Sequence, residues 1–371
     1  MRKLIQATCL VVALVCPIAI FGQSNRVVLN PRASYIDVAA RRAELQRNKS
    51  ERVSAALAQL GTCGLLAPVD APAGPMRIPP HYLHGSHGPT NPAEHEMTQV
   101  YAAFEMRVTA GMNRFLATGN HGEAQCAQAQ IDRWAQANAL MDYDADANGQ
   151  SWFQVEWTLS SIATSESVLL NDPKLDRAMT TRDVAWMNKV AHRMIGFPKA
   201  AREHNNHHYW RGLAAIATGV VSSDDELFNF GVQAFHDAVN EIDQRGAFPK
   251  EMQRSERSIH YQSFALQPLV PIAEFAERQH VPLYSYKSAS GHTLADAIVY
   301  LGQIVGDPSI VKAYTPVDQL IDSDATDFFS SLEFFTHRFP NRQLPASIVD
   351  ALKKPTFATR LGGSTTVLAG M

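Results

Sequence analysis

The sequence predicts a mostly α-helical domain, and three observations favour this fold class. Apolar residues recur at helical spacing, most clearly in the run Phe228, Val232, Phe235, Val239 and Ile242. Helix-start signals precede such runs, as at Asn91, Pro92 and Glu94, where Asn can cap, Pro loses no hydrogen bond and Glu can reach back. Alternating strand patterns are scarce before residues 365–368. We therefore expect hairpins of antiparallel helices with short connections.

These signals place the expected helices in chain order. They cover residues 39–60, 93–118, 123–140, 152–170 and 181–195, a stretch that begins at about His207, a stretch capped by Ser223 and Glu226, and residues 255–278, 293–305 and 317–335. The helix over 255–278 should be interrupted near Pro268 and Pro271, because proline lacks the N–H group that a helix needs. No long linker or internal repeat divides the chain, so we expect one domain over residues 24–371.

A long loop rich in proline and glycine, residues 66–92, follows the first expected helix. It contains His81, Tyr82, His84 and His87. Loops of this length inside a compact domain are usually functional or disordered. The aromatic and imidazole side chains favour a functional loop, such as a lid.

Residues 1–23 have the parts of a secretory signal peptide, with Arg2 and Lys3 before an apolar run and small residues after it. The run is too short for a membrane span. We therefore expect a periplasmic or secreted protein with no membrane span. Its remaining cysteines are Cys63 and Cys126, and an oxidising compartment favours one disulfide over two buried free thiols.

Removal of the signal peptide takes Arg2 and Lys3 with it and leaves 31 basic against 36 acidic residues, a net charge of −5. With that balance, a protein that binds a polyanion must concentrate its positive charge locally. We expect a monomer without a nucleic-acid partner.

The first segment whose side chains could bind a ligand or catalyse a reaction reads HNNHHYW, from His204 to Trp210. A helix start explains one asparagine as a cap and Trp210 as a packed aromatic. It explains poorly why two asparagines and three histidines occur together. The N-terminus of a helix attracts an anion and disfavours imidazolium, so a neutral His207 at this position could accept a proton or bind a carboxylic acid.

The second segment reads RSERSIHY, from Arg254 to Tyr261. On a helix that extends back to Arg254, this residue, Arg257 and Tyr261 share one face. A guanidinium would then lie close to the phenol and favour its phenolate form. The alternative is a solvated basic face with Tyr261 at its edge.

Together these motifs resemble those of polysaccharide lyase family 5, the alginate lyases, which carry an N-N-H-x-Y-W block and a later R-x6-Y. The order of HNNHHYW, GAFPKE and RSERSIHY matches, as do ALQPL at 265–269, the aromatic stretch 334–340 and RLGGSTTVL at 360–368. The similarity runs from about Thr181 to the end of the chain. It implies an all-α fold, an incomplete α/α toroid of antiparallel helical hairpins around a deep cleft. It also implies β-elimination in a 1,4-linked uronic acid polymer, without a metal or other cofactor, and places Cys63 and Cys126 like a disulfide pair of the family.

The resemblance also implies roles for individual residues. Asn206 and His207 would neutralise the substrate carboxylate, and Arg254 would stabilise the carboxylate or the phenolate. Tyr261 would remove the C5 proton and return a proton to O4, whereas cleavage at guluronate would need His207 as the base. Further contacts to the anionic polysaccharide are expected from Asn205, Tyr209, Trp210, Arg257, His84, His87, Trp157 and Arg360.

One departure from the family pattern concerns the lid. The family has a lysine in a motif resembling G-S-D-K, whereas this chain reads Gly85-Ser86-His87-Gly88 and has no lysine between Cys63 and Glu105. Either His84 or His87 contacts the substrate instead, or the polymer differs from mannuronate-rich alginate. Polyglucuronate is the rival substrate, because its C5 proton and O4 also lie on one side of the ring.

Other readings of the sequence are less favoured. His204, His207 and His208 have helical spacing, but neither a cysteine nor a His-Glu motif completes a zinc site, so no metal is expected. A hydrolase would need paired carboxylates across a cleft, and no such pair stands out. A non-catalytic protein that binds or exports an acidic polysaccharide on the same toroid remains the alternative function.

Overall fold

The computed structural model describes residues 27–85, 87–200 and 202–371, so the expected signal peptide over 1–23 lies outside the described residues. Helices dominate the described chain. The α-helices are α1 Val38–Arg47, α2 Glu51–Ala58, α3 Pro92–Thr118, α4 His121–Gln136, α5 Gly149–Leu169, α6 Arg177–Ile195, α7 Asn206–Ser222, α8 Asp225–Glu241, α9 Ser258–Arg278, α10 Leu294–Gly306, α11 Leu332–Arg338, α12 Ala346–Ala351 and α13 Thr365–Ala369. Short 3-10 turns are η1 Cys63–Leu65, η2 Glu251–Gln253, η3 Ser255–Arg257, η4 Leu283–Ser285, η5 Pro308–Ala313 and η6 Thr359–Leu361. Strands β1 Tyr82–His84 and β2 His87–Thr90 form an antiparallel hairpin.

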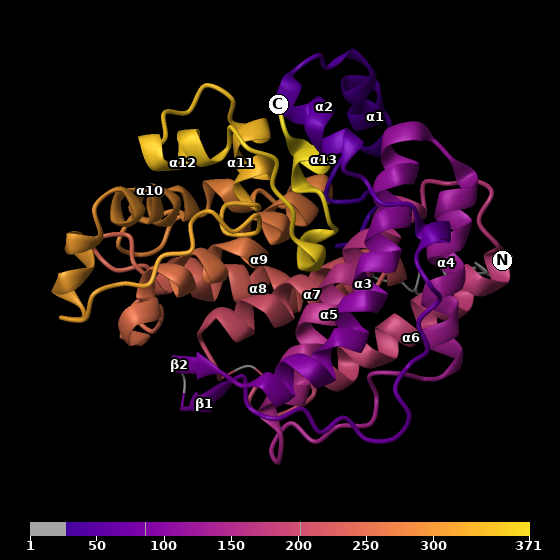
Figure 1. Cartoon of the computed structure of the whole chain (residues 1–371), viewed down its shortest axis with the longest axis horizontal. Coiled ribbons are helices and arrows are strands. Elements are labelled where there is room, and N and C mark those ends of the chain that lie inside the picture. The colour runs from indigo at the N-terminus through magenta and orange to yellow at the C-terminus, as the bar shows by residue number, and fades with distance from the viewer. Residues whose placement is uncertain (1–26, 86, 201) are drawn as a thin grey trace, which may run out of the picture.

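The long helices form an incomplete α/α toroid, as expected. Helices α3, α5, α7 and α9 pack side by side as an inner row, and each is followed in the chain by an outer helix, α4, α6, α8 or α10. The C-terminal elements α11, α13 and η6 pack between α9 and α3, so they fill the gap that the row leaves open. In Figure 1 the hairpin β1–β2 lies at one edge of this assembly.

The inner row is buried on nearly every side. Almost all residues of α5 and α7 are buried, including many serines and threonines. Several of these hydroxyls are satisfied within the helix, as where Ser160 donates to the Glu156 carbonyl and Thr164 donates to the Ser160 carbonyl. Small residues also let helices approach closely: a Cβ on Gly231 of α8 would lie 2.6 Å from the Gly212 carbonyl oxygen of α7.

Several expected elements are wrong in their bounds. Residues 39–60 form two helices, because Asn48 accepts a hydrogen bond from the Ser50 N–H and Ser50 then caps α2. Helix α8 is capped by Asp224, whereas Ser223 has a left-handed conformation and ends α7. Of the expected helix over 317–335, only the end is helical, as the start of α11.

Two expectations about secondary structure are also wrong. Residues 365–368, which alternate like a strand, belong to helix α13, which Ser364 caps. Helix α9 continues through Pro268 and Pro271 without interruption. Both prolines are buried among neighbouring helices, so tertiary packing outweighs the two missing hydrogen bonds.

The connection over 66–92 contains the hairpin, and the Cys63–Cys126 disulfide, which is confirmed, joins the preceding turn η1 to α4. Within residues 27–85, 87–200 and 202–371, a helix with the length and apolar character of a membrane span does not occur.

Candidate active site

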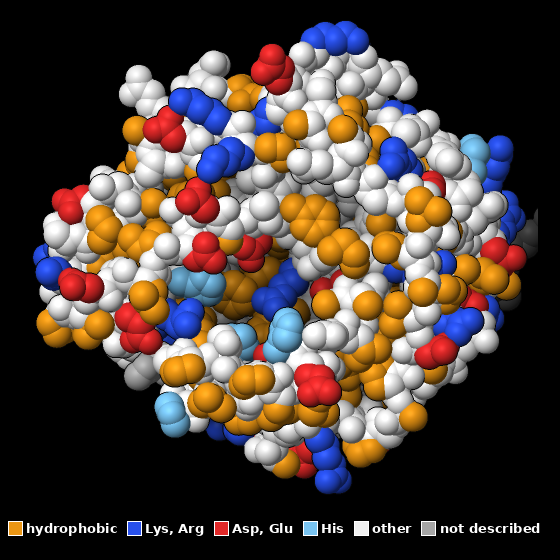
Figure 2. Space-filling model, in the orientation of Figure 1, with side chains coloured by type: hydrophobic (Ala, Val, Ile, Leu, Met, Phe, Trp, Pro, Cys, Tyr) orange, Lys and Arg blue, Asp and Glu red, His pale blue; other side chains and the backbone are white. Residues whose placement is uncertain are grey.

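A cavity of about 990 Å³ opens on the face shown in Figure 2, where arginine and histidine side chains gather in the hollow. Its walls come from the hairpin, from η6 and from the N-terminal parts of all four inner helices. Three of these helices are capped there by asparagines: Asn91 for α3, Asn148 for α5 and Asn205 for α7. The inner helices therefore direct the positive ends of their dipoles toward one site, which favours a negatively charged ligand.

Side chains add to this local positive character. The cavity is lined by Arg254 and Arg360 and by the histidines His81, His95, His207 and His260. Among the described residues that line it, lysine is absent. Glu94 and Asp327 also line the cavity, so these positive groups share it with two acidic side chains. A chain with a negative net charge thus gathers arginines, histidines and helix N-termini at one site, as binding of a polyanion requires.

The structure brings Arg254 and Tyr261 together. The centre of the Arg254 guanidinium lies 3.7 Å from the centroid of the Tyr261 ring. The expected continuous helix does not extend to Arg254, which precedes α9 in the turn between η2 and η3. The juxtaposition arises because this turn folds Arg254 back over the first turn of α9.

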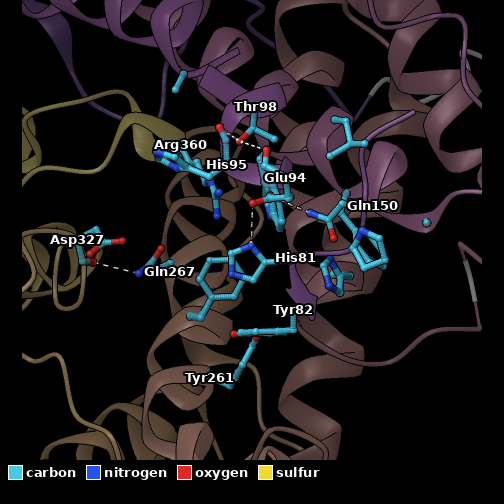
Figure 3. A pocket seen from close by; sticks show the side chains of 18 of the residues that line it. His81, Tyr82, Glu94, His95, Thr98, Gln150, Tyr261, Gln267, Asp327 and Arg360 are labelled. Carbon is cyan, nitrogen blue, oxygen red and sulfur yellow. Dashed lines mark hydrogen bonds and ion pairs between the residues drawn. The ribbon is translucent and has the colours of Figure 1, made fainter. Parts of the chain in front are cut away.

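Tyr261 also contacts a residue that the sequence analysis did not assign to the site. The Tyr82 hydroxyl lies 2.9 Å from the Tyr261 hydroxyl, and Figure 3 shows the two side chains meeting below His81. Burial raises the pKa of Tyr82 well above its usual value, and the neighbouring Tyr261 raises it further. Tyr82 therefore keeps its proton and can donate it in a hydrogen bond to a Tyr261 phenolate.

Contacts between the hairpin and η3 hold Tyr82 in this position. Arg257 donates to the Gly88 carbonyl oxygen at 3.2 Å, and its guanidinium lies 5.1 Å from the Tyr82 ring. The Gly88 N–H in turn donates to the Glu256 carboxylate. Arg257 is not among the residues that line the cavity and holds the hairpin, so its expected contact with substrate stays a prediction.

His207 lies in the cavity wall with its ring fixed on two sides. The ring stacks on Phe153 of α5, with centroids 3.4 Å apart. Its Nδ1 atom lies 3.2 Å from the carboxylate of Glu156, a buried residue one turn further along α5. The sequence analysis predicted His207 but neither of these partners, because nothing in the sequence pairs α5 with α7.

The two asparagines that precede His207 face different surroundings. Asn205 lines the cavity, and its side-chain oxygen caps α7. Asn206 is buried behind the wall, where its backbone N–H and side-chain amide donate to Glu251. Its Oδ1 atom has no hydrogen-bond partner among the described residues. Burial raises the pKa of Glu251, while the hydrogen bonds from Asn206 and the charge of Arg254 lower it.

Arg360 enters the cavity from η6 and lies over Trp157, 4.0 Å from the ring centroid. Burial lowers the pKa of this guanidinium, and the negative charges of Glu105 and Asp327 oppose that shift. Trp157 and Arg360 were both expected at the site, and both line the cavity.

Other cavity residues had not been assigned a role. Burial and the nearby charges of Arg257 and His81 lower the pKa of His260 to about 4, so its imidazole is neutral near pH 7. Glu94 is an acidic residue in the wall, held by His81 at 3.2 Å and by Gln150 at 3.4 Å, as Figure 3 shows. His260 adjoins Tyr261 in the second motif, whereas Glu94 was recognised only as a helix-start residue.

Three residues with an expected substrate contact lie outside the cavity lining. Tyr209 and Trp210 are completely buried, and the Tyr209 hydroxyl donates to Glu241 behind the wall, so both belong to the core. His84 is exposed on β1 and does not line the cavity. The side chain of His87 lies outside the described residues, so its expected contact stays a prediction.

Among the residues that the structure describes, groups of three or more histidine, cysteine, aspartate or glutamate side chains arranged to hold a metal ion do not occur.

Comparisons with known proteins connect this site to a family. A family model described as alginate lyase matches residues 40–311. A polysaccharide lyase of Stenotrophomonas maltophilia is 30% identical over 275 residues, which cover 72% of this chain and 78% of that protein. An alginate lyase of Pseudomonas aeruginosa is 27% identical over 273 residues, which cover 71% of this chain and 72% of that protein.

Solved structures resemble the whole fold. Alginate lyase A1-III from Sphingomonas species A1 superposes with a TM-score of 0.84 at 37% identity, over 92% of this chain and 97% of that one. A variant of alginate lyase A1-III in complex with a tetrasaccharide gives a TM-score of 0.86 at 36% identity, over 93% of this chain and 97% of that one. An alginate lyase from Bacteroides ovatus, at 14% identity and a TM-score of 0.68, shares the fold.

Proposed function

The chain belongs to the alginate lyase family and is a polysaccharide lyase, and we propose that it cleaves 1,4-linked polyuronates by β-elimination at the cavity around Tyr261. The observation that carries this proposal is the arrangement of Tyr261, whose ring lies under the Arg254 guanidinium and whose hydroxyl meets that of Tyr82. A non-catalytic binding protein would not need a phenol held between a cation and a hydrogen-bond donor.

The reaction has two chemical demands. The C5 proton of a uronate is a poor acid unless the adjacent carboxylate is neutralised, and the O4 leaving group needs a proton. In our proposal Tyr261, as the phenolate, takes the proton from C5. The C4–O4 bond then breaks, a double bond forms between C4 and C5, and the same phenol returns the proton to O4.

Two groups support the phenolate before it acts. Arg254 places its positive charge over the ring, and Tyr82 donates a hydrogen bond to the phenolic oxygen. Both interactions stabilise negative charge at Tyr261 and favour its role as a base.

Carboxylate neutralisation is proposed to involve His207, Asn206 and Arg360. His207 and Arg360 line the cavity and can face a substrate carboxylate directly. Asn206 lies behind the wall with its amide on Glu251, so its contribution requires a movement of that amide toward the cavity. Asn205, which lines the wall beside it, is a second amide available to the sugar.

The polymer that fits this mechanism has the C5 proton and O4 on the same side of the ring. Mannuronate and glucuronate both meet that condition, so one phenol serves both steps. We propose alginate as the substrate, which the names of the relatives favour, with cleavage at its mannuronate residues because these meet the geometric condition. Polyglucuronate is the rival substrate, because the hairpin lacks the family's lysine.

We further propose that the protein works outside the cytoplasm as a monomer and has no nucleic-acid partner. The support is the signal-like segment over residues 1–23 and the acidic net charge. N-terminal sequencing of the exported protein and light scattering of the purified protein test the first two points.

The decisive test mixes the purified protein with polymannuronate, polyguluronate, polyglucuronate and hyaluronate and follows the ultraviolet absorbance of the unsaturated product. We expect the fastest rise with polymannuronate or polyglucuronate. The absence of a rise with every polymer, in a sample that still binds them, would favour the non-catalytic alternative.

A further inference from the structure

We propose that Glu156 is a positioning residue that holds the neutral His207 imidazole in the tautomer with hydrogen on Nδ1, leaving the Nε2 lone pair for the ligand. The inference rests on the proposed function because His207 is one of the residues proposed to act on the substrate. What it adds is the position of the hydrogen on the His207 ring. It concerns a carboxylate that is fully buried and has no contact with the cavity of its own.

The geometry at the two atoms carries the inference. The Glu156 Oε2 atom lies 3.2 Å from His207 Nδ1, and the Phe153 ring stacked on the imidazole prevents it from turning away. A carboxylate can only accept hydrogen bonds. A neutral imidazole that faces it must therefore carry its single hydrogen on Nδ1.

The carboxylate is itself anchored as an anion. The second oxygen of Glu156 accepts a hydrogen bond from Arg211 at 2.5 Å, and Arg211 is completely buried. The Arg211 guanidinium lies over Trp152, 4.2 Å from the ring centroid, and its other amino group reaches Glu203 at 3.0 Å. Because a buried arginine keeps its charge and is paired here, Glu156 is held in place with its negative charge.

This arrangement defines what His207 can do at the cavity. In the neutral state its Nε2 atom is a hydrogen-bond acceptor and a base. It can donate a hydrogen bond from Nε2 to a substrate carboxylate only after protonation. Neutralisation of the carboxylate by His207 thus requires the protonated ring, whereas proton abstraction from guluronate requires the neutral one.

The test is nuclear magnetic resonance of the full chain with ¹⁵N-labelled histidine, recorded at alkaline pH where the rings are neutral. Two-bond couplings distinguish hydrogen on Nδ1 from hydrogen on Nε2, and the His207 signals are assigned by their loss in His207→Gln. We expect hydrogen on Nδ1 in the wild type. Hydrogen on Nε2 would overturn the proposal, and this readout stands even if no polymer is cleaved.

The variant Glu156→Gln tests whether the Glu156 carboxylate sets the tautomer of His207. The glutamine amide can accept from Arg211 and donate to Nδ1, so we expect His207 to switch to hydrogen on Nε2. We also expect kcat/KM to fall roughly 10- to 100-fold, because a hydrogen bond to a charged group is replaced by one to a neutral amide. An unchanged tautomer in the folded variant would contradict the proposal. Should the variant not fold, the wild-type spectrum still decides.

The matched control is Glu203→Gln. It removes the other ion pair of Arg211 and leaves the contact between Glu156 and His207 intact. We expect this variant to keep hydrogen on Nδ1 and activity near that of the wild type. A tautomer switch in Glu203→Gln as well would show that general disturbance of the network, rather than Glu156, sets the state of His207.

Discussion

Tyr261 is the side chain whose removal most directly separates chemistry from binding. Tyr261→Phe keeps the ring under Arg254 and deletes only the hydroxyl. Since the hydroxyl is proposed to move the proton, we expect kcat to fall by a factor of about 10² to 10⁴ while polymer affinity changes little. Initial rates from ultraviolet absorbance and binding by calorimetry measure the two quantities.

A suitable control for Tyr261→Phe is Tyr286→Phe, because the Tyr286 hydroxyl bonds to Asn240 away from the cavity. We expect that variant to retain activity. If Tyr261→Phe stayed active, the proton would be moved by another group, and His207 would be the first to examine.

Tyr82→Phe tests the hydrogen bond that supports the phenolate. The variant keeps the ring beside Arg257 but cannot donate to Tyr261. Since a hydrogen bond to a charged group contributes about 1.5–3 kcal/mol, we expect kcat/KM to fall roughly 10- to 100-fold, less than for Tyr261→Phe. An equal loss in both variants would mean that Tyr82 itself moves the proton.

At the level of residues, the sequence predicted the site residues that occur within short sequence motifs. His207, Arg254 and Tyr261 occur in two compact motifs, and the structure brings all three to one cavity. The contacts of Glu156 with His207 and of Tyr82 with Tyr261 were not predicted, because each residue reaches its partner from a distant segment through the fold. Tyr209 and Trp210 show the converse error, because a motif does not tell which of its aromatic residues face inward.

At the level of elements, hydrophobic spacing and caps predicted the long helices with small errors at their ends. The failures occur where local propensity competes with packing. Residues 365–368 alternate like a strand, yet they form α13, which packs against α3 and α11. Pro268 and Pro271 argue for a break, yet α9 is continuous because it is buried among neighbouring helices.

The close contact between α7 and α8 leads to a prediction about stability. In Gly231→Ala the new Cβ would lie 2.5 Å from the Ile216 Cβ and 2.6 Å from the Gly212 carbonyl oxygen. Because both atoms belong to a tightly packed helix pair, we expect the free energy of unfolding to fall by about 1–3 kcal/mol. Denaturant unfolding measures it.

Gly306→Ala is the control for this packing argument, because a Cβ at Gly306 would meet no atom within 4 Å among the described residues. We expect its free energy of unfolding to equal or slightly exceed that of the wild type. Equal losses in both variants would mean that the helical backbone, rather than the contact, causes the effect.

At the level of the whole molecule, the toroid explains how an acidic chain gathers positive groups at one cavity. All four inner helices begin at the cavity, so their dipoles add to the charges of Arg254 and Arg360. This convergence could not be predicted from helix positions alone, because it depends on the ring that the hairpins form. The resemblance to the family supplied that ring in advance, and the structure agrees with it.

Two acidic side chains that hold protons are buried away from the cavity. Asp183 of α6 is completely buried, and its carboxyl group forms a hydrogen bond with that of Asp132 on α4. Burial, together with the charges of Glu166 on α5 and Asp132 on α4, raises its pKa to about 9. Burial also raises the pKa of Glu166 to about 7. The folded protein therefore holds protons here that the unfolded chain releases.

This difference predicts that stability falls as the pH rises. From the ordinary pKa of 3.8 to the folded value of about 9, folded Asp183 keeps a proton that the unfolded chain loses. Each pH unit in that window then costs up to about 1.4 kcal/mol. Asp183→Asn cannot titrate, so we expect it to match the wild type near pH 4 and to be more stable at pH 8, by denaturant unfolding. Asp318→Asn, which changes an exposed aspartate, should show no such difference, and a parallel pH dependence in Asp183→Asn and the wild type would exclude Asp183 as the source.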